Sequence, residues 1–331
     1  MNSTPDVSVV LSVRNGGADL PKAIDSILTQ SLKNLELIAI NNGSTDGTRH
    51  FLDSIADPRL RVFHQADAGL AAALNRGISL ARGRYIARQD HDDLADSTRV
   101  AKQVEFLDAH PDHALVGTRA EIWVGNKPSG RFHDHPTDDS DLRFALIFNN
   151  YFVHSSVMMR KGALDEVGAY STDRLRQPPE DYELWSRIAR RFRVANLPER
   201  LTIYREVPTS MSREGSNPFQ EKLILISAEN LAAATTGMSK PEDIHLDIAS
   251  LIHGAPDRVK KGADVEAMCA VIAEAGRKIF GGRRFGDGDD PVAFRIRNIR
   301  YNFAMKGFMF RRMRHIASRA KGALRRISSS I

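Results

Sequence analysis

The fold of this chain is decided by a run of β-branched and apolar residues near its start, Val7-Ser8-Val9-Val10-Leu11-Ser12-Val13. A continuous run of this kind is typical of a strand that is covered on both faces. After a short loop, Asp19 can cap a helix that carries Pro21 in its first turn. The chain therefore begins with a strand and a helix, as expected at the start of a βαβ unit.

The same alternation continues as far as residue 90. We predict further strands over residues 35–40, 60–63 and 85–87, with helices between them. This order favours an α/β fold with a doubly wound sheet, whose ligands bind beyond the carboxyl ends of the strands. Polar loops fall at those ends, over residues 14–17, 41–47 and 90–93.

The loop that follows the strand at 85–87 contains Asp90-His91-Asp92-Asp93. Carboxylates this close together repel one another unless a cation neutralises them, and hard oxygen ligands suit Mg²⁺ or Mn²⁺. A metal held by so few carboxylates keeps positions for a diphosphate. The alternative is a solvated acidic turn, in which one aspartate caps a helix predicted to begin near Thr98. The place of the loop at the end of a strand favours the metal-binding interpretation.

The composition is that of an ordinary soluble globular protein, with 42% hydrophobic and 27% charged residues among 331. No apolar run reaches the ~18 residues of a membrane span, and the N-terminus does not resemble a secretory signal. The single cysteine, Cys269, excludes an intrachain disulfide and a multi-cysteine zinc site. We therefore expect a cytoplasmic protein.

Beyond the acidic loop the pattern is less regular. Helices are predicted over 98–109 and over about 218–234, whereas residues 238–292 are weakly patterned and suggest no chemistry. The acidic, glycine-rich stretch 286–291 favours a linker over a Ca²⁺ loop, because it lacks the spacing of an EF-hand.

Eight motifs carry a resemblance to a known family. In order they are Val7–Val13, Arg14-Asn15-Gly16, Asn42-Gly43-Ser44-Thr45-Asp46, Leu74-Asn75-Arg76-Gly77, Asp90-His91-Asp92-Asp93, His154-Ser155-Ser156-Val157-Met158, Glu180-Asp181-Tyr182-Glu183-Leu184-Trp185 and Tyr204-Arg205. Over about residues 7–212 they resemble the motifs of family 2 glycosyltransferases. The resemblance implies an inverting enzyme of the GT-A type, with a doubly wound mixed sheet and here a mostly helical C-terminal extension.

The resemblance also implies which residues bind the nucleotide-sugar donor. Asp90 is expected near the donor ribose. Asp92 is expected to be the main ligand of an Mn²⁺ or Mg²⁺ ion that bridges to the diphosphate, with Asp93 in support. Asn15, Asn42 and Arg76 are expected on the same donor side. A metal at this place would act as a Lewis acid on the departing diphosphate.

The acceptor side is implied in the same way. An acceptor hydroxyl needs a general base at neutral pH, and Asp181 matches the base of the family. His154 and Glu180 are expected beside it. The alternative for Glu180 and Asp181 is a plain helix start, where acidic residues favour the dipole, and the alternative for His154 is a structural role. We interpret Trp185 as core packing.

Two positions depart from the family pattern. The family usually has an aspartate at Asn41 or Asn42, and the second of these typically accepts a hydrogen bond from the N3–H of uracil. An asparagine both accepts and donates, so we hypothesise an altered or relaxed preference for the base. Val207 stands where a histidine often assists the metal or the diphosphate, and valine cannot coordinate either.

The C-terminal end carries the positive charge. Residues 295–326 contain eleven Lys and Arg and no acidic residue, which leaves a net charge of −5 on the remainder. A basic amphipathic helix predicted over 309–327 suits an anionic membrane surface; the alternative is a helix packed on the catalytic domain. Nucleic acid is not expected as a partner, because no aromatic residue follows Phe310 in the basic run.

These observations predict three regions: a catalytic domain over 1–212, a helical extension over 213–292 and a basic tail over 293–331. The predicted function is metal-dependent, inverting transfer of a sugar from a nucleotide-sugar donor to a glycan or lipid-linked acceptor in cell-surface polysaccharide synthesis. The predicted location is the cytoplasm, with peripheral attachment to the inner face of the cell membrane. The alternative is a non-catalytic, nucleotide-sugar-binding relative that acts as a membrane- or partner-attached module.

Overall fold

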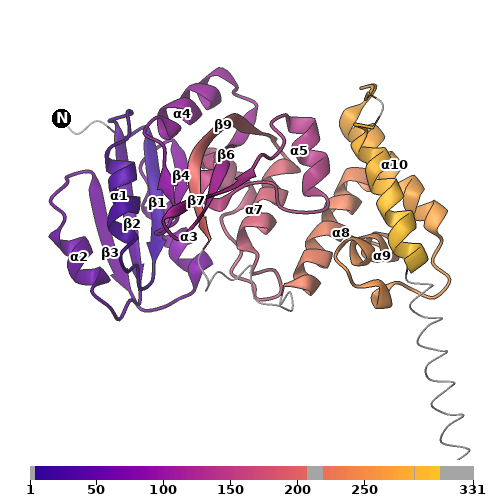
Figure 1. The fold of residues 1–331 in the computed structure, drawn as a ribbon, viewed down its shortest axis with the longest axis horizontal. Coiled ribbons are helices and arrows are strands. Elements are labelled where there is room, and N and C mark those ends of the chain that lie inside the picture. Colours follow the sequence, from indigo (N-terminus) through magenta and orange to yellow (C-terminus); the bar gives the residue numbers. More distant parts are fainter. Residues whose placement is uncertain (1–3, 207–218, 287, 306–331) are drawn as a thin grey trace, which may run out of the picture. The chain divides into compact units, whose positions relative to one another are not determined.

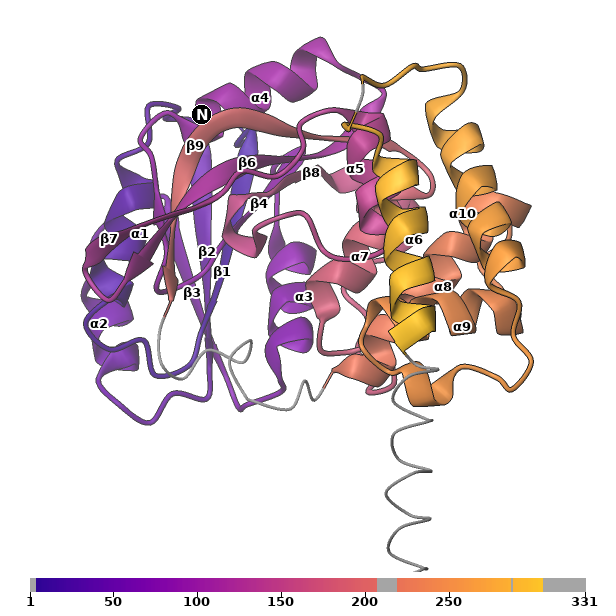
Figure 2. The same ribbon diagram turned by 45° about the vertical axis from the view of Figure 1, so that its right-hand side comes forward.

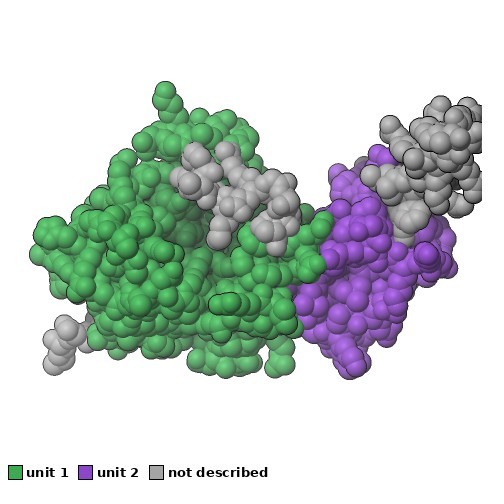
Figure 3. Space-filling model, turned by 90° about the horizontal axis from the view of Figure 1, so that it is seen from below, with its two compact units in different colours: residues 1–222 green, residues 223–331 purple. Residues whose placement is uncertain are grey.

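A computed structural model describes residues 4–206, 219–286 and 288–305. The chain divides into two compact units, residues 1–222 and residues 223–331 (Figure 3). The predicted catalytic-domain boundary at 212 and the predicted amphipathic helix over 309–327 lie outside the described residues.

The described part of the first unit contains one mixed sheet (Figures 1 and 2). Its strands are β1 (Val7–Val13), β2 (Leu35–Asn42), β3 (Leu60–Gln65), β4 (Tyr85–Gln89), β5 (Leu94–Ala95), β6 (His113–Val124), β7 (Lys127–His133), β8 (Met158–Arg160) and β9 (Arg193–Glu206). Their order across the sheet is β3-β2-β1-β4-β8-β6-β9-β5, and β7 pairs with β6.

The helices of this unit connect the strands. They are α1 (Leu20–Leu28), α2 (Thr48–Ser54), α3 (Leu70–Leu80), α4 (Arg99–Ala109), α5 (Asp139–Leu146), α6 (Lys161–Val167) and α7 (Glu180–Ala189), together with a short 3₁₀ helix η1 (His154–Ser156). The strands and helices predicted between residues 7 and 109 are confirmed.

The first four strands are parallel, as the alternating pattern predicts. From β4 onward the directions mix: β8 lies antiparallel to both β4 and β6, whereas β9 runs parallel to β6. The structure therefore confirms an α/β fold of the GT-A type, with a mixed sheet. The loops that follow β1, β2 and β4 all leave the sheet at one edge, where parallel strands end.

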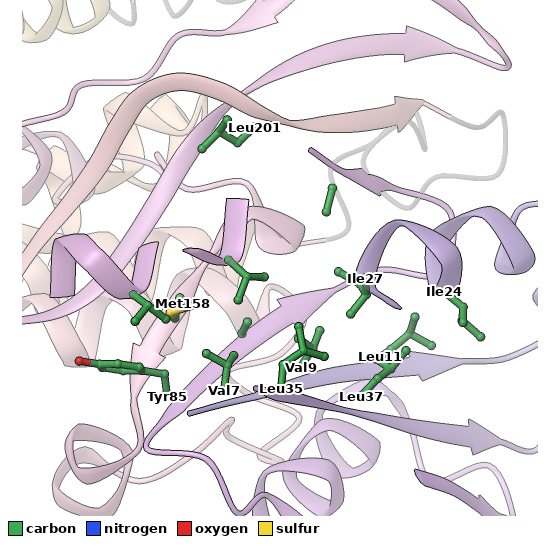
Figure 4. Packing of buried hydrophobic residues seen from close by; sticks show 14 of the residues in the cluster. Val7, Val9, Leu11, Ile24, Ile27, Leu35, Leu37, Tyr85, Met158 and Leu201 are labelled. Atoms are coloured by element: carbon green, nitrogen blue, oxygen red, sulfur yellow. The ribbon is translucent and has the colours of Figure 1, made fainter. Parts of the chain in front are cut away.

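Alternate residues of β1 and β2 pack on opposite faces of the sheet, so both strands are buried throughout. Val9, Leu11 and Leu37 belong to a core that also includes Ile24 and Ile27 of α1 (Figure 4). On the other face α3 packs so closely that a Cβ added to Gly77 would lie 2.4 Å from a methyl carbon of Val10. Figure 2 shows α1 and α3 on opposite sides of these strands.

The predicted cap of α1 differs from the observed one. Asp19 occupies the N-cap position, but its side chain makes no capping hydrogen bond and instead forms an ion pair with Arg205. An ion pair with a nearly buried arginine offers the carboxylate a stronger partner than a backbone N–H does. The aspartate that serves the start of α4 is Asp96, which accepts hydrogen bonds from the backbone N–H (2.8 Å) and the hydroxyl (2.6 Å) of Thr98.

The second unit is helical where it is described. It contains most of α8 (Gln220–Thr236), then α9 (Asp243–Ile252), η3 (Pro256–Arg258) and α10 (Val265–Phe280), and residues 291–305 are helical as well. Its core includes Ile224, Ala228, Ala249 and Ala255, and larger side chains such as Ile248 and Ile272 are also buried in this unit. Among the described residues no helix has the length and apolar character that a bilayer span requires.

Candidate functional site

The loops after β1 and β2 are locked together by hydrogen bonds. Asn15 has a positive φ of 55°, and its side-chain carbonyl accepts from the backbone N–H of Thr45 at 2.8 Å. In return, the backbone N–H groups of Asn15 and Gly16 donate to the hydroxyls of Ser44 and Thr48, both at 2.9 Å. Asn15 therefore holds the second loop in place.

Asn42 lies at the end of β2 and is buried. Its side-chain carbonyl accepts from Gln65 at 2.8 Å and from the backbone N–H of Ala68 at 3.1 Å. Its amide donates to Asp67 at 3.1 Å and to the carbonyl of Gly69 at 3.4 Å. All the hydrogen-bonding positions of this amide are used inside the protein.

Arg76 supports this arrangement from α3. Its guanidinium donates to the side chain of Gln65 at 2.9 Å and to the carbonyl of His64 at 3.2 Å, and it lies over the ring of Phe63. It is part of the scaffold behind the loops.

Asp90, the first residue after β4, is held by a buried cation. Its carboxylate pairs with Arg88, whose side chain is 1% exposed, and accepts from the hydroxyl of Ser155 at 2.7 Å. Burial favours the neutral acid, but the charge of Arg88 and the hydrogen bond from Ser155 outweigh it. The pKa of Asp90 is therefore below its usual range.

Asp93 faces the protein interior. Its carboxylate accepts from the backbone N–H of Arg205 at 2.8 Å, and it shares the single hydroxyl proton of Ser155 with the carboxylate of Asp90. Burial raises its pKa well above the ordinary value, and the charges of Asp90 and Asp92 add to the effect. Asp93 thus ties the acidic loop to η1 and to the end of β9.

Asp92 differs from both of its neighbours. Within the part of the chain that is described, its carboxylate makes no hydrogen bond or ion pair with another residue. Partial burial and the charge of Asp90 raise its pKa. Of the three carboxylates in the acidic loop, it is therefore the one available to bind a metal ion or another ligand.

A second carboxylate site lies at the start of α7. Asp181 accepts from the side-chain amide of Asn150 at 2.8 Å and from the backbone N–H of Tyr182 at 2.7 Å. Burial, with the charges of Glu180 and Asp90, raises the pKa of Asp181 to about 7. Because the charge of Asp90 contributes, the two carboxylate sites act on each other electrostatically.

His154 and Glu180 border these two sites. Nε2 of His154 lies 2.9 Å from the hydroxyl of Tyr170 and accepts from Arg88 at 3.3 Å. Burial and the charge of Arg88 lower the pKa of His154 to about 3, so its imidazole is neutral. Glu180 is buried, and burial raises its pKa. Trp185 is fully buried against the His154 and Tyr170 rings, as the core-packing interpretation predicts.

Sequence reasoning overlooked four residues that support these groups: Arg88, Arg99, Asn150 and Ser155. Arg99 is fully buried and donates to the carbonyls of Ser155 and, at 3.3 Å, Arg88. Arg88 could have been found, because a cation inside a covered strand requires an anionic partner. Two other arginines have partners inside the protein: Arg160 donates to carbonyls of α4 and the following turn, and the nearly buried Arg205 pairs with Asp19.

The acidic loop fits a metal ion that the bound ligand helps to coordinate. Among the described residues no group of three or more His, Cys, Asp or Glu side chains could hold a metal by themselves. Mg²⁺ and similar ions, however, are often held by one or two carboxylates together with substrate phosphates. The uncommitted carboxylate of Asp92, crowded by Asp90, has the chemistry that such an ion requires.

Comparison with known proteins decides the family. Residues 8–168 match the profile described as Glycosyl transferase family 2. The Bacillus subtilis protein EpsE, whose name calls it a glycosyltransferase, is 34% identical over 68% of this chain and 82% of its own length. This chain belongs to glycosyltransferase family 2. A glycosyltransferase of Haemophilus influenzae is 29% identical over 70% of this chain and 75% of its own.

Solved structures agree on the fold of this glycosyltransferase. TarS of S. aureus, residues 1–349 in complex with UDP-GlcNAc, superposes with a TM-score of 0.62 at 15% identity over 93% of this chain and 92% of that one. The mannosyltransferase PcManGT of Pyrobaculum calidifontis, in complex with GDP-Man and Mn²⁺, superposes with a TM-score of 0.51 at 18% identity, over 92% and 85%. At these identities the likeness concerns the fold.

The predicted family, the fold and the identity as a glycosyltransferase that uses a nucleotide-sugar donor are thus confirmed. The roles of individual site residues stay predictions. The structure groups Asp90, Asp92, Asp93 and His154 around Ser155 and Arg88, with Asp181 and Glu180 nearby. Asn15, Asn42 and Arg76 lie with the loops after β1, β2 and β3.

Proposed function

We propose that this glycosyltransferase is an inverting, metal-dependent enzyme in which Asp181 is the general base and Asp92 the principal metal ligand. The observation that carries the proposal is the raised pKa of Asp181. A pKa of about 7 keeps a large fraction of this carboxylate ionised at neutral pH and still lets it accept a proton.

The surroundings of Asp181 suit proton transfer. Asn150 and the backbone N–H of Tyr182 each donate to a different oxygen, which fixes the carboxylate and leaves further lone pairs on both oxygens. An acceptor hydroxyl would give its proton to one of these lone pairs while its oxygen bonds to the anomeric carbon. The bond from that carbon to the diphosphate breaks in the same displacement, so configuration inverts and the nucleoside diphosphate leaves.

Asp92, with Asp90 beside it, would hold a divalent cation on the donor side. Such an ion supplies Lewis-acid stabilisation of the charge that develops on the leaving diphosphate. Asp93 would keep the loop in position through Ser155 and Arg205, while Arg88 compensates the charge of Asp90. The neutral imidazole of His154 would place an uncharged side chain beside the metal-binding and general-base positions.

The acceptor is proposed from chemistry and from the family. A glycan or lipid-linked sugar provides the hydroxyl that Asp181 would deprotonate, and cell-surface polysaccharide synthesis is the process in which such acceptors occur. The basic C-terminal region, residues 295–326, would hold the enzyme at an anionic membrane surface where a lipid-linked acceptor resides.

The test uses the full chain with UDP-, GDP-, dTDP- and CDP-sugars, with and without Mn²⁺. One donor should be bound and hydrolysed in the presence of metal. Asp92→Ala should lose metal-dependent binding of the donor, whereas Asp181→Asn should retain binding and lose turnover. Asp134→Asn, which removes an exposed carboxylate paired with Arg200, should behave as the wild type.

The results also distinguish the non-catalytic alternative. Donor binding without any turnover, unchanged in Asp92→Ala and Asp181→Asn, would replace the enzyme by a nucleotide-sugar-binding module. Turnover that is equal with Mn²⁺ and with a chelator would remove the metal from the proposal while leaving Asp181 as the base.

A further inference from the structure

The part of the donor site where the nucleobase would bind contains a carboxylate that no sequence motif identifies. Asp67 follows β3, and its side chain is 41% exposed beside Arg14, which is 59% exposed. Gly43 comes so close that an added Cβ would lie 2.7 Å from the backbone nitrogen of Asp67, and its φ is +76°. Asp67 therefore lies against the turn that begins at Asn42.

A chain of hydrogen bonds fixes which way the amide of Asn42 points. Arg76 can only donate, so the Gln65 oxygen must face Arg76 and the Gln65 nitrogen must face Asn42. The backbone N–H of Ala68 also donates to the oxygen of Asn42. Both constraints turn the Asn42 nitrogen toward Asp67.

The consequence is that Asn42 cannot itself accept from a base. Its two acceptor positions are filled by Gln65 and Ala68, and its donors are directed to Asp67 and Gly69. The neighbouring carboxylate is less occupied. One oxygen of Asp67 accepts from Asn42 and from the backbone N–H of Gly69 at 3.1 Å. The other pairs with Arg14 at 2.6 Å and keeps a lone pair free.

Resting on the proposed function, we infer that Asp67, positioned by Asn42, reads the nucleobase of the donor by accepting a hydrogen bond from a ring N–H. Of the two pyrimidines that differ at ring position 3, uracil presents an N–H there, whereas cytosine presents a lone pair. The carboxylate therefore selects a uridine nucleotide over a cytidine nucleotide.

The two residues also depend on each other. An aspartate at position 42 would place a second carboxylate about 3 Å from Asp67, where like charges repel. Asparagine at 42 and aspartate at 67 thus belong together: the two side chains form a hydrogen-bonded pair, and its more exposed member carries the carboxylate.

The inference is tested by measuring the binding of UDP and of CDP to the full chain by calorimetry, with Mg²⁺ present. The wild type should bind UDP more tightly than CDP. In Asp67→Asn the amide can donate to the ring nitrogen of cytosine, so UDP affinity should fall about tenfold to a hundredfold and CDP affinity should rise. A UDP-to-CDP ratio that is unchanged in Asp67→Asn would overturn the inference.

Asp134→Asn is the matched control, because Asp134 and Arg200 form an ion pair of the same 2.6 Å length with 40% and 42% exposure. It should leave both affinities unchanged. A wild-type protein that binds neither UDP, CDP, GDP nor ADP would instead defeat the proposed function, so the two failures are distinct.

A second measurement tests the pairing without any nucleotide. Asn42→Asp should lower the midpoint of urea unfolding, and adding Asp67→Asn to it should restore most of the loss, because the carboxylates no longer oppose each other. If Asn42→Asp unfolds at the wild-type urea concentration, the Asn42–Asp67 contact is not as we infer.

Discussion

Asp90 and Asp181 are the same residue type, and both lie near another acid at a terminus of a secondary-structure element, yet their pKa values are shifted in opposite directions. The charge of buried Arg88 keeps the pKa of Asp90 below its usual range despite burial. Among the residues that the structure describes, no cation is paired with Asp181, and burial raises its pKa to about 7. Its hydrogen bonds from Asn150 and Tyr182 moderate that rise without cancelling it.

The difference shows how one fold lowers the pKa of one carboxylate and raises the pKa of another within the same site. A paired carboxylate stays charged and suits binding of cations and polar groups, whereas a buried unpaired one titrates near neutral pH and suits general-base catalysis. The presence or absence of a paired cation sets the pKa of each carboxylate, and the sequence motif alone does not reveal that cation.

The largest effect is expected from removing the unpaired carboxylate. Asp181→Asn keeps the shape of the side chain but cannot accept a proton, so the turnover number should fall by about 10² to 10⁴ while donor affinity stays within a factor of a few. Steady-state and single-turnover rates on the preferred donor measure it. A turnover number within threefold of the wild type would remove Asp181 from the mechanism.

Next in size is the removal of the buried cation. Arg88→Gln leaves Asp90 without its partner, and breaking one side of a buried ion pair should lower the free energy of unfolding by about 3–5 kcal/mol. Urea unfolding measures it. The matched variant Arg200→Gln breaks an exposed pair with Asp134 and should cost less than about 1 kcal/mol. Equal losses in the two variants would mean that Arg88 does not hold Asp90.

The comparison also predicts how stability depends on pH. Because the folded-state pKa of Asp181 is raised, the folded protein binds more protons than the unfolded chain between about pH 4 and pH 7. The contribution of Asp181 therefore destabilises the fold progressively as pH rises through that window. Asp181→Asn should be more stable than the wild type by on the order of 4 kcal/mol at pH 8, and the gain should vanish near pH 4.

The smallest effect concerns the neighbour that tunes Asp181. Without the hydrogen bond from Asn150, the carboxylate loses a partner that favours its ionised form. In Asn150→Ala the acidic limb of the pH–rate profile should move upward by up to about one pH unit. Asp134→Asn, which removes an exposed carboxylate paired with Arg200, should not move it. A limb that stays in place in Asn150→Ala would show that this bond does not tune the base.

Local patterns were sufficient for much of the fold. The run Val7–Val13 and the spacing of apolar residues in 70–81 depend on neighbours in sequence, and both elements were predicted. The helices α9 and α10 were not, although Glu242 and Asp264 cap them and each buries larger apolar side chains such as Ile248 and Ile272; these local signals were overlooked. The wrong expectation for the side chain of Asp19 has another origin: its partner Arg205 is 186 residues away.

The site follows the same division. The acidic loop and the Glu180-Asp181 pair were recognised by their motifs, because the residue types are short-range features. Their pKa shifts could not be predicted from the motifs, because Ser155 reaches Asp90 through the packing of β4 against η1, and Asn150 reaches Asp181 from the loop after α5. Only Arg88, two residues before Asp90, was close enough in the sequence to be found. The same holds for Asp67, whose importance emerges only from the hydrogen bonds of Asn42.

The most direct test of the contrast is an NMR titration of the protein labelled with ¹³C at the aspartate carboxyl carbons. The Asp181 resonance is assigned by its absence in Asp181→Asn, and no acceptor needs to be known. We predict a midpoint near pH 7 for this resonance. A midpoint near pH 4, the ordinary value of an aspartate, would contradict the account.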